Sequence, residues 1–242
     1  MMKVSHNELV TLCAKAYDSL KRQCGEAENI ANMVVDLEMA GLRGVALFLS
    51  ALGYIEQENK YHAVAIEQDD EKVTVDLGGE SLLCFLPALI DVAVEKLIQG
   101  QHVQLHIRNC RHRWFGFSEL LKLAGKGLSV RAQWPNGESP SYVDCVHNAG
   151  NRYPDIYFDR PCENAIRELQ SQDLRVDIQL TMFVVSSING EPDINSDMQS
   201  AAEKRAWRHG IEVDEVHWNT LKAYVARSLV ENSERSLQGA GE

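Results

Sequence analysis

Apolar residues recur at helical spacing through the first fifty residues of the chain. The segments with this spacing are residues 9–20, 27–38 and 45–52. Intervals of three and four residues predict amphipathic helices that bury one stripe. Ser5 and Glu8 fit a capping box ahead of the first segment, and Gly25 is placed to end it. The first 55 residues are therefore expected to form an N-terminal helical segment.

From residue 62 the pattern changes to alternation of apolar and polar residues, which is typical of strands. The expected strands are residues 62–66, 72–76, 102–107, 128–134, 142–146, 155–158 and 175–185. The acidic stretch 68–71 is expected to turn the chain between the first two. Helices are expected between later strands, one from near Pro87 to Ile98 and one over residues 118–124.

Two further helices are expected to close the chain. Ser196 and Gln199 have the spacing of a second capping box, ahead of a helix that reaches His209. Asp214 is placed to cap a last helix that runs to about Glu231.

This order of elements predicts an α/β fold, with a mixed sheet between N-terminal and C-terminal helices. We expect a single domain over residues 1–232 and a flexible polar tail over residues 233–242. The parts of that domain are N-terminal helices (1–55), an α/β core (56–134), an irregular middle region (135–195) and closing helices (196–232).

The net charge of −11 comes from 35 acidic and 24 basic residues spread along the chain. A chain this acidic is unsuited to nucleic-acid backbones and anionic membranes, so neither partner is expected. No apolar run in the sequence is long enough to cross a bilayer, and the first residues lack the apolar region of a signal peptide. The six cysteines show no disulfide framework. We therefore expect a cytoplasmic globular protein.

Residues 41–45 read Gly-Leu-Arg-Gly-Val and resemble the end of the N-terminal helices in the malate/L-lactate dehydrogenase type 2 family. That family continues with Ser-His-Gly and, four positions after the histidine, an arginine. The corresponding positions here are Phe48 and Leu52. The apolar stripe through these residues suggests that this helix packs into the core instead.

Further segments carry the same resemblance. Residues 107–114 are similar to the family's Val-Arg-Asn-Ser-x-His-Phe-Gly, and the register continues without gaps to Leu128. Residues 87–99 and 202–221 resemble a central helix and the closing helices of the family, whereas residues 135–185 are shortened and do not match. The end of the chain, residues 230–241, resembles the ending of an uncharacterised bacterial family.

The resemblance implies hydride transfer between NAD(P) and a 2-hydroxy or 2-oxo acid, or a cyclic imino acid. It also implies a homodimer, formed through residues 180–185 or the N-terminal helices. Carbonyl reduction needs a proton donor and a cation that orients the substrate carboxylate, and Phe48 and Leu52 supply neither. Gly78 and Gly79 occupy the place of a Gly-x-Gly turn in the family, which makes them weak cofactor-binding candidates or an ordinary tight turn.

His112 is the catalytic candidate that the motif retains, with Asn109 as a hydrogen-bonding partner in the ligand site. The alternative is that His112 only satisfies a local carbonyl. Arg111 and Arg113 flank it, together with Arg108, and suit an anionic ligand such as a carboxylate or phosphate. The alternative interpretation is that these arginines form ion pairs at the protein surface.

Three hypotheses of function follow. The first is a divergent NAD(P)-dependent oxidoreductase that uses His112. The second is a non-catalytic relative that binds a small anionic metabolite or partners an enzyme. The third is a zinc-stapled interaction module, because Cys110 with His112 and Cys145 with His147 each place two ligands on one side of a strand. That spacing is not a standard zinc signature, so no metal site is assigned.

Overall fold

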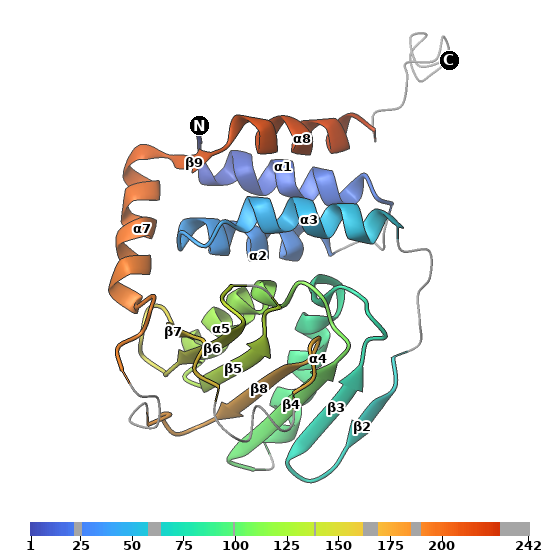
Figure 1. Cartoon of the computed structure of the whole chain (residues 1–242), viewed down its shortest axis with the longest axis vertical. Helices are drawn as coiled ribbons and strands as arrows, with labels where there is room; N and C mark the ends of the chain where they lie inside the picture. The colour runs from blue at the N-terminus through green and yellow to red at the C-terminus, as the bar shows by residue number, and fades with distance from the viewer. Residues whose placement is uncertain are drawn as a thin grey trace, which may run out of the picture.

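The computed structural model describes residues 1–21, 26–57, 64–98, 100–137, 139–161, 169–184 and 190–227. A layer of helices lies above a mixed β-sheet, and one further helix runs along the side between them (Figure 1). The expected α/β class is confirmed. Within the described residues, no helix is both long and apolar enough to span a membrane.

The helical layer combines the two ends of the chain (Figure 1). It contains α1 (His6–Asp18), α2 (Ala27–Met39), α3 (Gly44–Gln57) and α8 (Glu215–Ala226). The capping box of α1 is confirmed, because the Ser5 hydroxyl accepts the amide of Glu8 at 3.2 Å and the Glu8 carboxylate accepts the amide of Ser5 at 2.7 Å. Asp214 caps α8 as expected, accepting the amide of Val216 at 2.8 Å. The expected stop at Gly25 lies outside the described residues, as does the chain after residue 227.

The main sheet has seven strands in the order β2-β3-β4-β8-β5-β6-β7. They are β2 (Ile66–Gln68), β3 (Lys72–Asp76), β4 (His102–Arg108), β5 (Ser129–Pro135), β6 (Tyr142–His147), β7 (Asp155–Phe158) and β8 (Leu174–Gln179). β3 and β4 are parallel, and the other neighbouring strands are antiparallel. Of the strand expected at residues 62–66, residues 62 and 63 lie outside the described residues, and β2 begins only at Ile66 and extends into the stretch 68–71 that was expected to turn.

Helices link the sheet to the upper layer. α4 (Leu82–Leu97) packs on β4, and α5 (Gly116–Gly125), which follows the short 3-10 turn η1 (Arg113–Phe115), packs on β5 and α2. α7 (Ser196–His209) rises along one side and leads into β9 (Ile211–Val213), which pairs with β1 (Met2–Val4) (Figure 1). The N-terminal strand therefore pairs with the segment that follows α7.

Pro87 was expected near the start of its helix, and this is wrong. α4 begins at Leu82, five residues earlier, so Pro87 lies inside it. The amide of Leu82 donates to the carbonyl of Arg111 at 2.9 Å, and Ser81 bridges to Arg111 as in a parallel sheet. This tertiary contact fixes the start of the helix, and Pro87 costs α4 one internal hydrogen bond.

The strand expected at residues 175–185 ends at Gln179. Gln179 is the last residue of β8 in register with both neighbours, opposite His102 of β4 and Ser129 of β5. Beyond it, Leu180, Met182 and Val184 are exposed. Without a partner strand the apolar run cannot continue the ladder, whatever its propensity.

The cap of α7 is also displaced from its expected position. Asn195, not Ser196, is the N-cap, and its side chain accepts the amide of Met198 at 2.9 Å. The side chain of Gln199 is buried and donates to the carbonyl of Pro154 at 2.6 Å. Gln199 therefore ties the helix to the loop before β7 and does not reach back to cap it.

Candidate functional site

Phe48 and Leu52, at the positions where the resemblance expects a catalytic pair, are both fully buried, with 0% exposure. They lie on the inward stripe of α3 with Val45 and Ile55, each 1% exposed. Helical spacing puts these four residues on one face. The interpretation that this face of α3 belongs to the core is confirmed.

The loops after β3 and β4 lie side by side, because parallel strands end at the same edge of the sheet. The amide of Gly79 donates to the carbonyl of Asn109 at 2.6 Å, and the amide of Arg111 donates to the carbonyl of Glu80 at 3.0 Å. We call residues 76–81 and 108–112 the β3–β4 loop cluster. It brings together the sequence-predicted residues Gly78, Gly79, Asn109, Arg111 and His112.

His112 sits in this cluster with a left-handed backbone, φ 59°. Its Nδ1 is 2.9 Å from the hydroxyl of Ser81, and its ring meets the ring of Tyr54 edge-on at 5.5 Å. Burial lowers the pKa of His112 to about 4, helped by the nearby charges of Arg111 and Arg113. The imidazole is therefore neutral near pH 7, and its one remaining N–H is a much weaker acid than that of an imidazolium.

The neighbours expected to bind a ligand are largely engaged within the protein. The side-chain amide of Asn109 donates to both carboxylate oxygens of Asp76 at 3.0 Å, not to His112. This hydrogen bond, followed by that of the Gly78 amide, lowers the pKa of Asp76. Arg111 is exposed and lies 4.6 Å above the ring of Tyr54. Arg111 presents its charge to solvent, as does Arg108, which is also exposed.

Arg113 holds two segments of backbone together. Its guanidinium donates to the carbonyl of Cys110 at 2.7 Å and to that of Pro135 at 2.8 Å, which links the ends of β4 and β5. Two of its donors are thus committed to carbonyls, and the side chain is half-buried. A structural role for Arg113 accounts for this geometry.

Gly78 and Gly79 have φ of 60° and 100°, which explains the choice of glycine. The amide of Gly78 donates to the carboxylate of Asp76 at 2.8 Å, and that of Gly79 to Asn109. Because both amides are occupied inside the loop cluster, neither is available to a phosphate. The ordinary tight turn fits this arrangement better than a cofactor cradle.

The two Cys-x-His pairs lie apart in the sheet. Cys110 follows β4 and Cys145 lies in β6, with β8 and β5 between those strands. No group of three or more potential metal ligands occurs among the described residues. The fold therefore does not bring the four side chains to one metal.

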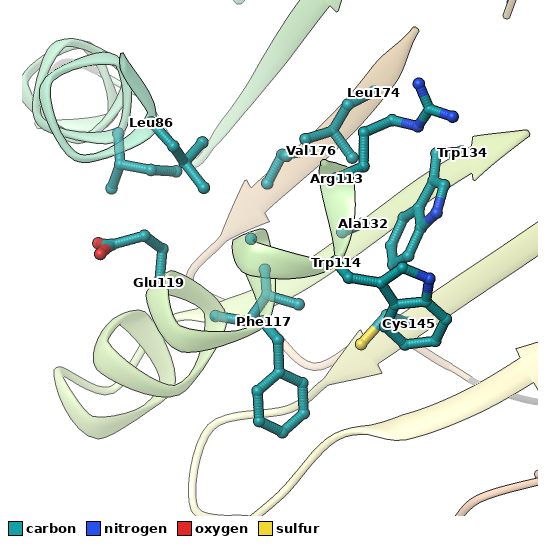
Figure 2. A pocket seen from close by; sticks show the side chains of 13 residues that line it. Leu86, Arg113, Trp114, Phe117, Glu119, Ala132, Trp134, Cys145, Leu174 and Val176 are labelled. Carbon is teal, nitrogen blue, oxygen red and sulfur yellow. The ribbon is translucent and has the colours of Figure 1, made fainter. Parts of the chain in front are cut away.

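The space between α4, α5 and the sheet is packed interior. Figure 2 shows Leu86 of α4, Phe117 of α5 and Val176 of β8 around it, with Arg113 and Trp134 at one end. The cavity that remains there is about 10 Å³, near the minimum for one water molecule. It is too small for a metabolite.

A larger cavity, which sequence reasoning missed, lies beside the start of α3. Its volume is about 520 Å³. We call it the α3 pocket; the described residues that line it are Gly41, Leu42, Arg43, Ala46, Leu47, Ser50, Trp114, Asn136, Ser139, Pro140 and Ile194. The signal available in the sequence was Arg43 within the recognised segment 41–45, but its partners come from four separate regions of the chain.

The wall of the α3 pocket is held by hydrogen bonds. The indole N–H groups of Trp114 and Trp134 donate to the side-chain oxygen of Asn136 at 3.1 and 3.3 Å. The side-chain nitrogen of Asn136 donates to the carbonyl of Pro140 at 2.9 Å. Trp114 also meets the ring of Trp134 edge-on at 5.3 Å. This gives the pocket a fixed aromatic side.

Arg43 supplies the positive charge in the lining of the α3 pocket. Arg43 has a left-handed backbone, φ 57°, and an exposed side chain that makes no hydrogen bond or ion pair with any described residue. The first turn of α3 follows it, with Ala46 in the pocket wall and the Val45 amide bound to Glu38 at 2.7 Å. A helix N-terminus favours anions, as does a guanidinium. Among the described lining residues there is no acid, histidine, lysine, cysteine or tyrosine.

Comparison with known proteins bears on the fold. A family described as "Protein of unknown function (DUF3726)" matches residues 4–76. No curated protein matches the sequence. A malate dehydrogenase from Pyrococcus horikoshii OT3 superposes with a TM-score of 0.71 at 10% identity, over 96% of this chain and 97% of that chain.

Two further structures agree with it. A putative malate/lactate dehydrogenase from E. coli gives a TM-score of 0.68 at 11% identity, over 98% of each chain. The sulfolactate dehydrogenase of Methanocaldococcus jannaschii gives 0.65 at 12% identity, over 93% of this chain and 97% of that chain. The protein therefore has the malate/lactate dehydrogenase-like fold that its sequence motifs predict.

Proposed function

We propose that the protein binds a small anionic metabolite in the α3 pocket and does not carry out hydride transfer. The α3 pocket itself carries this proposal: it offers one unpaired guanidinium, and no proton donor among its described titratable side chains. The solved structures of this fold include malate and sulfolactate dehydrogenases, whose named substrates are anions. That supports an anionic ligand here.

Three positions support the proposed absence of hydride transfer. Phe48 and Leu52 are core residues, so α3 presents neither a proton donor nor a second cation at these places. His112, with its pKa near 4, is about one part in a thousand protonated at pH 7. Removal of a positioned general acid alone slows such reactions by about 10²–10⁴-fold.

The ligand class follows from the two sides of the pocket. Arg43 matches a carboxylate, which its planar fork can bind through two hydrogen bonds. The rest of the lining is mainly apolar, with the ring of Trp114 on one side and Ile194 beside it. We therefore propose a carboxylate with a compact apolar or flat body, in the class of 2-hydroxy and 2-oxo acids.

A divergent NAD(P)-dependent oxidoreductase that uses His112 is the second candidate. The fold favours it, and so does the contact of His112 with Tyr54 and Ser81 at the end of a parallel strand pair. Titration of NADH and NADPH fluorescence against the protein tests it directly. Binding of either, with oxidation that depends on an added 2-oxo acid, would establish catalysis and overturn the non-catalytic proposal.

The test of the α3 pocket is thermal stabilisation by malate, lactate and their 2-oxo counterparts, with the corresponding amides as uncharged controls. A ligand that binds only the folded state raises the melting temperature with concentration. We expect Arg43→Gln to abolish this shift, and Leu47→Trp to abolish it by filling the pocket. Arg208→Gln removes an exposed charge from α7 that does not line the pocket, and should leave it intact.

If the carboxylates stabilise all four proteins equally, or none, the α3 pocket is not their binding site. Leu47 is half-buried, so the tryptophan variant has space toward the pocket. Its folding is checked by the urea midpoint without ligand.

We further propose that the protein is a cytoplasmic homodimer. The observation in favour is the exposed apolar segment after β8, where Leu180, Met182 and Val184 are 57%, 65% and 75% exposed. Phe183 packs against Val146 and Tyr157 and so anchors the segment on the sheet. Exposed apolar groups in one place mark association surfaces.

A further inference from the structure

We propose a second binding site, for a phosphate-bearing ligand, in a cavity of about 330 Å³ next to the C-terminal end of α7. We call it the α7 cavity. It lies beside the pairing of β1 with β9, and the basic residues that line it are Lys3, Arg43, Arg205 and His209. They come from β1, the turn before α3, and α7.

These basic side chains are not used inside the protein. Arg43, Arg205 and His209 are exposed and make no hydrogen bond or ion pair with any described residue. Lys3 lies 3.9 Å from Glu212, but both side chains are more than half exposed, at 59% and 62%. Such a pair contributes little and yields easily to a stronger anion. The chain as a whole carries a net charge of −11, so a group of basic side chains without strong partners at one cavity is unusual for its surface.

The acids of the α7 cavity do not cancel this charge. Glu212 is the partner of Lys3. Glu38 is half-buried and its carboxylate accepts the Val45 amide at 2.7 Å, so it is directed at the start of α3. Arg205 and His209 on α7 have no carboxylate partner among the described residues. Arg43 has none within ion-pair distance. Burial raises the pKa of Glu38 and the nearby charge of Arg43 opposes that rise, so the charge of Arg43 is offset in part.

Two glycines let the backbone bring these groups together. Gly41 has φ of 80°, and a Cβ there would lie 3.4 Å from the Cβ of Ala202 on α7. Gly210 has φ of 84°, and a Cβ there would lie 3.2 Å from the carbonyl of Val4. Without side chains at these places, the Arg43 turn and β1 approach α7 closely. Lys3, Arg43 and Arg205 thus come into one lining.

A phosphate suits this lining better than a single carboxylate does. The carbonyl end of α7 opposes any anion, so the binding energy must come from the side chains. Two guanidinium forks match phosphate oxygens through paired hydrogen bonds, and a lysine adds a point charge. The larger charge of a phosphate gains more from several cations than a carboxylate does.

The α7 cavity shares Arg43 with the α3 pocket, and Gly41 lines both. The test therefore uses Arg205, which lines the α7 cavity alone. Failure of this site and failure of the proposed function then give different results. Leu47→Trp closes the α3 pocket without touching the α7 cavity.

The experiment is calorimetric titration of the full chain with inorganic phosphate and pyrophosphate at constant ionic strength, with chloride as the control anion. We expect saturable binding of pyrophosphate, weakened about tenfold or more by Arg205→Gln, since a charge-assisted hydrogen bond contributes roughly 1.5–3 kcal/mol. Arg208→Gln, one turn along the same exposed helix, and Leu47→Trp should stay within about twofold of the unmodified protein.

Three outcomes overturn the proposal. One is the absence of saturable binding up to about 10 mM pyrophosphate. Another is equal weakening by Arg205→Gln and Arg208→Gln, which would show general surface attraction. The third is loss of pyrophosphate binding in Leu47→Trp, which would place the anion in the α3 pocket. Both arginines are exposed, so the two glutamine variants are expected to fold equally well.

Discussion

Phe48→His inserts the residue that the dehydrogenase resemblance expects at this position of α3, and we expect it to destabilise the protein by about 2–5 kcal/mol. Phe48 is 0% exposed. The smaller ring forfeits roughly 1–2 kcal/mol of apolar burial and packing. An imidazole with no hydrogen-bond partner in the core costs about 1–3 kcal/mol more. A position that lines a wet active site would show neither cost.

The assay is urea unfolding at equilibrium, where the midpoint should fall while the slope stays constant. Ser50→His is the matched control, because Ser50 lies two residues along the same helix and is exposed. It should change stability by no more than about 0.5 kcal/mol. Phe48→His with Leu52→Arg should not restore NADH oxidation with any 2-oxo acid. Equal stability of Phe48→His and the unmodified protein, or turnover by the double variant, would refute the assignment of this face to the core.

Three further predictions concern other parts of the molecule. His112 should titrate by NMR near pH 4. Because its folded pKa lies below the ordinary 6.5, the neutral imidazole contributes its full stability above pH 6.5. This contribution is lost as the pH falls from about 6.5 to 4, by at most about 3 kcal/mol. A measured pKa above 6 would contradict this. Asp144→Ala should cost about 3–5 kcal/mol in urea unfolding, because it removes the buried carboxylate to which Arg131 and Gln133 donate at 2.5 and 3.1 Å. A loss below about 1 kcal/mol would show that the pair is solvated. Leu180→Asp with Met182→Asp should convert the proposed dimer to monomer in light scattering. Val216→Asp, at another exposed apolar residue, should leave the dimer intact. If the dimer persists in the double variant, its interface does not include the segment after β8.

Local and periodic features of the fold could be predicted from the sequence. The Ser5 capping box depends on residues three apart, and the α3 stripe on helical spacing, so both are encoded within one helix. The start of α4 and the end of β8 could not be predicted this way. The first depends on a bond from Leu82 to Arg111, the second on where β4 and β5 stop pairing. Tertiary contacts outweighed propensity at both places.

The same distinction applies to the candidate site. The motif around His112 predicted a cluster at the end of a strand, and the structure brings Gly79, Asn109 and His112 together there. The motif could not predict that Asn109 would bond Asp76, or that the glycine amides would be occupied, because these depend on the facing loop. The α3 pocket was missed since Arg43 and Trp114 meet only in three dimensions.

Under the proposed function, the two faces of α3 would let the fold persist without the chemistry of dehydrogenases. Residues two apart on a helix point about 200° apart, so Phe48 and Ser50 lie on opposite sides. Apolar side chains at Phe48 and Leu52 add to the core and strengthen the packing of the helix. They leave the outer side untouched, where Arg43 and Ser50 line the α3 pocket and Tyr54 contacts His112. A change on the inner face and a ligand site on the outer face would therefore be physically independent, which is the condition that the proposed ligand-binding role on this scaffold requires.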